Sequence, residues 1–117
     1  KSNPLPQLHI RTKINIEKKR DFLISQYSKE TFQATKSEIV TQLIKDNNPK
    51  SQALIKAAAG DADVMVRKTV LNQTKVISDD ILPEMEMLLS DSSYEIVASA
   101  LEKLTSSKAS KTNENGL

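Results

Sequence analysis

The feature that most constrains this fold is an internal repeat with a period of 30 residues. Ile55–Asp61 aligns with Met85–Asp91 without a gap, and the same offset continues through residue 71. The apolar residues that it pairs are Val64 with Tyr94, Val66 with Ile96, Val70 with Ala100 and Leu71 with Leu101. Residues 32–45 join the series less cleanly, at an offset near 31. Self-similarity at a fixed period of this length is typical of repeat proteins.

Each copy of the repeat is predicted to be a helix, a short loop with an aspartate, and a second helix. One such pair cannot bury both of its apolar faces, whereas stacked pairs cover each other. We therefore predict an all-α fold, a short right-handed α-solenoid of about three antiparallel helix pairs. The alternative is a plain helical bundle with coincidental spacing. The solenoid is favoured because the loop and both helices repeat together.

Apolar periodicity divides the chain into expected helices and flanking segments. Helices are expected at residues 16–27, 32–45, 49–59, 64–76, 78–89 and 92–104. Residues 15–104 would then form the repeat domain, preceded by an extended lead-in over residues 1–14 and followed by a flexible polar tail over residues 105–117. The chain has only two Gly and four Pro, which leaves little material for the turns of an all-β fold. Because it does not begin with Met, we expect further sequence upstream.

Residues at the expected helix ends support this division. Asn48 before Pro49 is an expected N-cap, and so is Asp63. Gly60 is expected to end its helix with a positive φ. Ser92 and Glu95 have the spacing of a capping box.

The core is expected to be aliphatic, because aromatic residues make up only 3% of the chain. The inward-facing positions of the helical stripes supply the candidates. The predicted core residues are Leu23, Ile39, Leu43, Ile55, Val66, Val70, Leu71, Met85, Leu88, Leu101 and Leu104.

Composition excludes several kinds of chemistry. With no Cys, the chain cannot form disulfides, thiolate zinc sites or cysteine nucleophiles. With one His, it cannot build a site that needs two imidazoles, and it has no Gly-x-Ser-x-Gly elbow or phosphate-binding Gly loop. We therefore predict no catalytic, cofactor-binding or metal-binding residues. No apolar stretch approaches the ~18 residues that a membrane span needs.

Residues 11–20 carry five positive charges and one acid. Such a stretch could contact nucleic acid or another anion. A solvated helical face is favoured, because no aromatic residues are interleaved for base stacking, and the net charge of the chain is only +2.

The stretch from Asp61 through Val66-Arg67, with Val70 and Leu71 after it, resembles the HEAT-repeat signature. In that family an Asp in the turn and an Arg in the following helix tend to form ladders between adjacent repeats. The resemblance implies this role for Asp61 and Arg67, and for Asp91 in the next unit. Val97 stands where the next Arg would be, so the ladder is not expected to continue.

A narrower resemblance covers most of the chain. Arg20–Gln26, Ala34–Val40 and Leu89–Val97 followed by Ala100-Leu101 look like the C-terminal helical-repeat region of zinc aminopeptidases of the aminopeptidase N type. The catalytic signatures of that family, His-Glu-x-x-His and Gly-x-Met-Glu-Asn, are absent. The resemblance thus implies a non-catalytic accessory module of a larger enzyme. It would pack near the catalytic domain and limit peptide access, and the zinc would belong to the parent enzyme.

Three functional hypotheses follow from these features. The first is the accessory module of a zinc metallo-aminopeptidase, whose partner is the remainder of the parent polypeptide. The second is a HEAT-type scaffold that binds another protein surface. The third and weaker one is a nucleic-acid-binding helical repeat. We expect a soluble chain of the cytoplasm or periplasm with no membrane partner.

Overall fold

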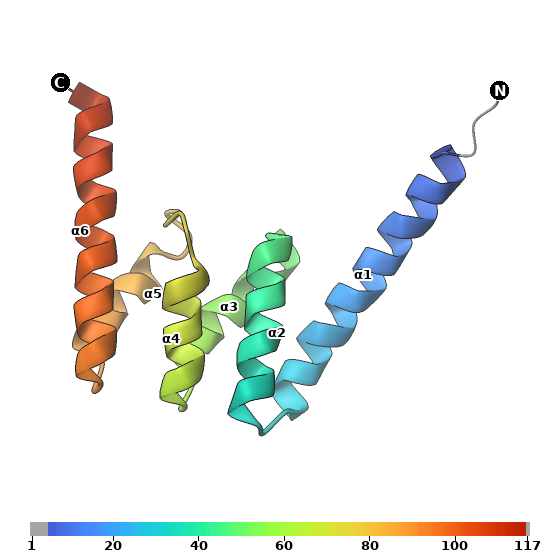
Figure 1. Ribbon diagram of the computed structural model, residues 1–117, viewed down its shortest axis with the longest axis horizontal. Coiled ribbons are helices and arrows are strands. Elements are labelled where there is room, and N and C mark those ends of the chain that lie inside the picture. Colours follow the sequence, from blue (N-terminus) through green and yellow to red (C-terminus); the bar gives the residue numbers. More distant parts are fainter. Residues whose placement is uncertain (1–4, 117) are drawn as a thin grey trace.

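The computed structural model describes residues 5–116, and the side chains of residues 10–107, as a row of helices (Figure 1). This part of the chain contains no strand, so the prediction of an all-α fold is confirmed. The helices are α1 (Leu5–Lys29), α2 (Gln33–Asp46), α3 (Gln52–Ala59), α4 (Val64–Gln73), α5 (Leu82–Met87) and α6 (Tyr94–Gly116). Short 3₁₀ turns precede α3 at Pro49–Ser51 and follow α5 at Leu88–Ser90.

Three of the helices, α2, α4 and α6, stand side by side in Figure 1, with α4 in the middle. In the described part of the chain, α4 packs against both α2 and α6, and α1 packs against α2. The short helices α3 and α5 cross behind the row and link its members (Figure 1). The molecule measures 55 × 45 × 17 Å along its principal axes, and is therefore a thin layer rather than a globule.

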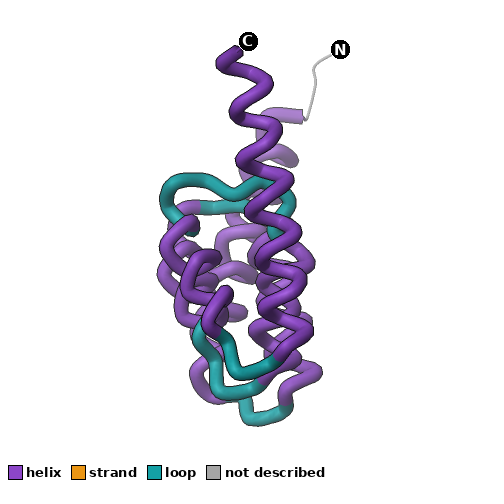
Figure 2. Tube along the Cα trace, turned by 90° about the vertical axis from the view of Figure 1, so that its left-hand side faces the viewer, coloured by secondary structure: helices purple, strands orange, loops and turns teal. Residues whose placement is uncertain are grey.

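Loops gather at the two ends of the helices. Figure 2, which views the row from the α6 side, shows loops at the lower end and another group higher up. The loops that precede α2, α4 and α6 lie at the lower end in Figure 1, and the 74–81 segment lies at the upper end. The two ends carry different side chains and are described separately below.

Residues 51–70 and 81–100 bury nearly the same positions. Ser51 and Ile81 are buried, as are Ile55 and Met85, and every buried residue from Val66 to Val70 has a buried counterpart 30 residues later. The backbone turns match as well, because Asp61 N donates to Ala58 O at 3.1 Å. Asp91 N donates to Leu88 O at 3.2 Å. The sequence repeat thus corresponds to two stretches of similar local structure.

Two of the expected caps are present. Asn48 accepts a hydrogen bond from Lys50 N, and Asp63 accepts one from Met65 N. Gly60 differs from the expectation, with φ at −111°. Its N–H donates to Ala57 O, and this tight turn ends α3 without a left-handed residue.

The capping box expected at the start of α6 is replaced by other contacts. Asp91, rather than Ser92, binds the backbone there by accepting from Ser93 N at 2.8 Å. Glu95 pairs with Lys68 on α4 at 2.8 Å. The aspartate of the loop is therefore the residue that shapes this turn.

The core is aliphatic, as composition predicted. Eight of the predicted core residues are buried: Ile39, Leu43, Ile55, Val66, Val70, Leu71, Met85 and Leu88. Leu23 and Leu104 are half-buried. Six further apolar residues on the same helical faces, outside that set, are also buried: Val40, Ala58, Ala59, Ile81, Ile96 and Ala100.

The prediction that Leu101 belongs to the core is wrong. Leu101 is 57% exposed, whereas its counterpart Leu71 is 1% exposed. The difference arises because α4 has a helix on each side, while α6 is the last helix of the row among the described residues. Among the described side chains of α6, the buried residues are Ile96 and Ala100.

The two flanking segments differ from their expected conformations. Residues 5–14 of the expected lead-in belong to α1, and residues 105–116 of the expected tail continue α6; residues 1–4 and 117 lie outside the described part. Pro6 falls in the first turn of α1, where proline is tolerated because its missing N–H would have no partner in the helix. No proline interrupts α6, so nothing in the sequence stops its propagation.

The segment between α4 and α5 is longer than predicted. Residues 74–76 and 78–81, expected to be helical, form turns and extended backbone instead. Thr74, Val76 and Ile77 are β-branched, and such residues lose side-chain freedom in a helix. This segment lines the cavities described below.

Candidate functional site

An acidic side chain organises each loop at the lower end of the row. Glu30 accepts from Phe32 N at 3.2 Å, and Asp61 accepts from Asp63 N at 2.8 Å. Asp91 accepts from Ser93 N at 2.8 Å in the same way. Each acid lies two residues before its N–H partner, so the three occupy equivalent places.

Arg67 on α4 joins two of these loops. Its Nε donates to Asp91 Oδ1 at 2.7 Å and its Nη2 donates to Asp91 Oδ2 at 3.1 Å. Its Nη1 donates to the backbone oxygens of Asp61 at 2.9 Å and Ala62 at 3.1 Å. The two ionic side chains are only 13% and 7% exposed. Arg67 therefore ties the loop before its own helix to the acid of the next loop.

The carboxylate of Asp61 has different partners from those expected. Lys36 Nζ on α2 lies 2.6 Å from Asp61 Oδ2, and the Tyr27 hydroxyl donates to the same oxygen at 2.6 Å. Lys36 also lies 4.9 Å from the centre of the Tyr27 ring, within cation–π distance. Arg67 reaches Asp61 through its backbone oxygen alone.

Two cation–acid contacts therefore join neighbouring units, Lys36 with Asp61 and Arg67 with Asp91. Lys36 precedes Arg67 by 31 residues, the offset at which residues 32–45 joined the repeat. Sequence analysis did not single out Lys36, although this spacing could have found it. In the part of the chain that the structure describes, the contact does not continue at either end of the series. Val97 stands where the next cation would be. At the other end, no cation among the described residues pairs with Glu30, whose carboxylate accepts a hydrogen bond from Gln26 on α1.

Hydrogen bonding lowers the pKa of both inter-unit acids. The Arg67 guanidinium holds the pKa of Asp91 below its ordinary value of 3.8, against the opposing effect of burial. Burial alone would raise the pKa of Asp61, but hydrogen bonds from Lys36, Tyr27 and the Asp63 N–H outweigh it and lower this pKa too. Burial and the hydrogen bond to Asp61 raise the pKa of Tyr27 above its usual range. Both acids are therefore ionised at neutral pH.

A further ion pair lies at the other end of α2. Arg20 on α1 donates through Nε to Asp46 Oδ2 at 2.5 Å and through Nη2 to Asp46 Oδ1 at 3.2 Å. The hydrogen bond from Arg20 lowers the pKa of Asp46. Of the basic stretch expected at residues 11–20, Arg20 is thus a buried structural residue, and residues 11–19 are exposed.

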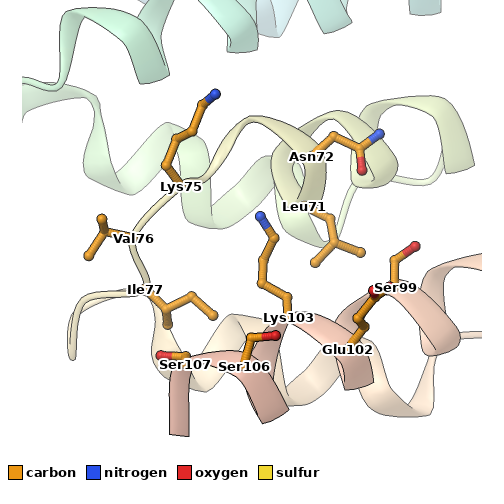
Figure 3. Close-up of a pocket in the computed structure, with 10 residues that line it drawn as sticks. All are labelled: Leu71, Asn72, Lys75, Val76, Ile77, Ser99, Glu102, Lys103, Ser106 and Ser107. Atoms are coloured by element: carbon orange, nitrogen blue, oxygen red, sulfur yellow. The ribbon is translucent and has the colours of Figure 1, made fainter. Parts of the chain in front are cut away.

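Two adjoining cavities lie beside the 74–81 segment. The larger, about 700 Å³, lies between α4, the 75–77 segment and α6, and Figure 3 shows ten residues that line it. The smaller, about 550 Å³, lies between the end of α2, α3 and the residues around Ser78. Lys75 and Val76 line both. We call the two cavities together, with their lining lysines Lys45, Lys75 and Lys103, the lysine groove.

Lys103 is the most constrained of these lysines. Figure 3 shows its side chain entering the larger cavity between Leu71 and Ile77, while Lys75 points away from α6. Its Nζ donates to Thr74 O at 2.5 Å, and no described carboxylate lies within ion-pair distance of it. Burial, and then the charge of Lys75, lower the pKa of Lys103. An anion in this cavity would favour the charged form of Lys103 and so oppose both effects.

No metal centre or membrane span is found in the described part of the chain. Its His, Cys, Asp and Glu side chains form no group of three or more that could hold a metal ion. No helix among the described residues is long and apolar enough to cross a bilayer. The side chain of His9 lies outside the described set.

Comparisons with protein-family models, with curated proteins and with solved structures found no match for this chain. Its function is therefore inferred from its own residues.

Proposed function

We propose that this chain is a non-catalytic, HEAT-like helical-repeat module that works by packing against another protein surface. In this proposal α1–α2, α3–α4 and α5–α6 are three antiparallel pairs of a short right-handed solenoid. The observation that carries the proposal is the recurrence of one contact at the repeat spacing, in which a cation of one unit meets the loop acid of the next. Lys36 with Asp61 and Arg67 with Asp91 are its two instances.

The ends of the row support a packing role. Tyr94 and Leu101 on α6 are 84% and 57% exposed, and Phe22 on α1 is 63% exposed. Large apolar side chains in contact with water at both ends are the kind of surface that a further protein element covers. We infer that protein, rather than nucleic acid, is the partner of these faces.

For the identity of the partner we propose the remainder of a larger zinc aminopeptidase of the aminopeptidase N type. The support is the sequence resemblance of the segments around Arg20, Ala34 and Leu89. In such an enzyme the module would pack near the catalytic domain and limit the access of peptides. The zinc would be held by the parent enzyme, in the cytoplasm or periplasm.

A free-standing scaffold is the second candidate, and the lysine groove favours it. A groove with three lysines and two cavities is a feature that a simple spacer does not need. Such a scaffold would use the same helical row, with a separate protein as its partner.

The proposal is tested by the sequence of the encoding gene and by an activity assay. We expect a reading frame that encodes His-Glu-x-x-His upstream of Lys1, and no hydrolysis of an aminoacyl-4-nitroanilide by the isolated chain with added zinc. Hydrolysis that depends on this chain would contradict the non-catalytic role. A complete reading frame that begins near Lys1 would contradict the aminopeptidase parent and leave the scaffold as the function.

A further inference from the structure

We propose that the lysine groove binds an extended acidic segment of a protein partner. This inference deepens the proposed helical-repeat function, because it names the chemistry of a partner for one surface of the row. It rests on the proposed function in one respect, namely that the chain is a module that binds protein.

The first argument is the charge of the groove. Lys45, Lys75 and Lys103 line the two cavities, and Glu102 is their one acidic lining residue among the described side chains. None of the three lysines forms an ion pair with a described carboxylate, whereas Lys36, Lys56 and Lys68 elsewhere in the row all do. The groove therefore carries three lysines against one acid and keeps a positive charge.

The second argument is the state of Lys103. Lys103 is half-buried as a residue, and its ammonium group donates to the backbone oxygen of Thr74. A buried ammonium without an anion is costly, and a carboxylate within hydrogen-bond distance offsets that cost. Ser99, Ser106 and Asn72 also line this cavity and offer hydrogen-bond donors to the same group.

The third argument is spacing. Lys45 lies in the last turn of α2, Lys75 in the segment that follows α4, and Lys103 on α6, so the three lysines come from successive parts of the row. Neighbouring packed helices lie about 8–10 Å apart, and an extended chain advances about 3.3 Å per residue. Carboxylates at every third residue of an extended peptide would therefore match lysines that come from successive parts of the row.

The walls of the groove favour a peptide over a nucleic acid. Val76, which is 81% exposed, and the half-buried Ile77 provide apolar contact surface beside the lysines. No aromatic side chain lines either cavity in the described part of the chain, and single-stranded nucleic acids are held largely by stacking on aromatic rings. Acidic residues separated by small apolar residues fit these walls.

The test is fluorescence anisotropy of the full chain with a labelled twelve-residue peptide that has Glu at every third position and Ala or Ser between. We expect saturable binding that Lys75→Gln with Lys103→Gln weakens about tenfold, the loss of roughly two charge-assisted contacts. Lys18→Gln with Lys19→Gln is the matched control. It removes the same charge from exposed positions of α1, and we expect less than about a twofold change.

Four results would overturn the proposal. The peptide with Gln in place of Glu could bind equally well, the control variant could lose as much affinity as the groove variant, or a twelve-residue oligothymidine could bind more tightly and displace the peptide. Absence of binding to any probe at low salt would overturn it as well. These outcomes leave the proposed module function intact, because that function is tested by the gene and by the peptidase assay.

A second readout uses the unmodified chain, so it does not depend on the folding of a variant. In NMR spectra the side-chain resonances of Lys103 should shift on addition of the Glu peptide, and its pKa should rise, because a bound carboxylate favours the charged form. Resonances of Lys18 should stay in place. Equal shifts of the Lys103 and Lys18 resonances would show that the peptide binds exposed lysines in general and does not use the groove.

Discussion

Arg67 is the residue on which the contact between neighbouring units depends most. Its guanidinium uses three nitrogens at once, two on the Asp91 carboxylate and one on the backbone oxygens of the 61–62 turn. A lysine has a single nitrogen and cannot reproduce this planar arrangement. At the equivalent place in the preceding unit, Lys36 is assisted by the Tyr27 hydroxyl, which shares its Asp61 acceptor.

A double-mutant cycle measures this contact. Arg67→Ala is expected to lower the free energy of unfolding by about 1–3 kcal/mol, because it leaves a largely buried carboxylate without its donor. With Asp91→Ala, the coupling energy should be about 1 kcal/mol or more. The exposed pair Lys68–Glu95 joins α4 to the first turn of α6, close to the same loop, and should give about 0.5 kcal/mol or less. Equal coupling for both pairs would show that the Arg67 contact contributes no more than a surface ion pair.

Acid should destabilise the fold through the inter-unit carboxylates. The pKa values of Asp61 and Asp91 are lower in the folded chain than the ordinary 3.8, so the unfolded chain binds protons more readily below about pH 4. The stabilisation that they provide is present above that pH and is lost as the pH falls through their folded values. Urea unfolding between pH 7 and pH 2 should show this loss as a fall in the free energy of unfolding. The fall should be less steep for Asp91→Asn than for the unmodified chain. An unchanged slope would assign the acid sensitivity to other groups.

Ser51 is a buried residue whose hydroxyl carries a cost. Its side chain is fully buried, and its Oγ has no hydrogen-bond partner in the described structure. Its counterpart in the next unit is the buried Ile81. Ser51→Ala should therefore raise the free energy of unfolding by up to about 1 kcal/mol, since it removes an unpaired polar group. Ser90→Ala, at an exposed position, should change it by less than about 0.5 kcal/mol.

At the scale of helices, position in the row decides which residues are buried. Leu71 and Leu101 are equivalent in the repeat, yet one is covered by a neighbouring helix and the other is open to solvent. Sequence periodicity identifies the face of a helix on which a residue lies. It does not show whether another helix covers that face, because that depends on the number of units.

A pair of truncations tests this difference. Leu71→Ala is expected to cost about 2–5 kcal/mol, as for other buried leucines. Leu101→Ala should cost less than about 1 kcal/mol, because most of its side chain already contacts water. Thermal and urea unfolding of both variants would check this. Comparable losses at the two positions would mean that α6 is covered in solution by another element.

Much of the helical organisation could be predicted from the sequence. Asn48 and Asp63 cap helices as their residue types indicated, and the loop acids Asp61 and Asp91 lie at equivalent turns. The start of α1 and the end of α6 could not be predicted, because proline is tolerated in a first helical turn, where Pro6 lies, and the polar residues 105–116 are compatible with both helix and coil. The lysine groove was not predicted because it forms only where α4 ends before residue 76, and because Lys103, on another helix, contributes to it.

At the scale of the whole molecule, the helices form a layer and not a bundle. The radius of gyration is 17.2 Å, compared with about 13 Å for a compact globule of the same length. A layer of this kind leaves both faces and both ends of the row accessible. This is the geometry that the proposed repeat module needs, since every unit then contributes to the binding surface.

The order of the helices in the row is tested most directly by methyl–methyl NOEs on a sample with labelled Ile, Leu, Val and Ala methyl groups. Linear stacking predicts NOEs between Val40 or Leu43 on α2 and residues of α4, and between α4 and Ile96 or Ala100 on α6. It predicts none between α2 and α6. Direct NOEs between α2 and α6 would show that the helices close into a bundle, and would contradict the stacked repeat.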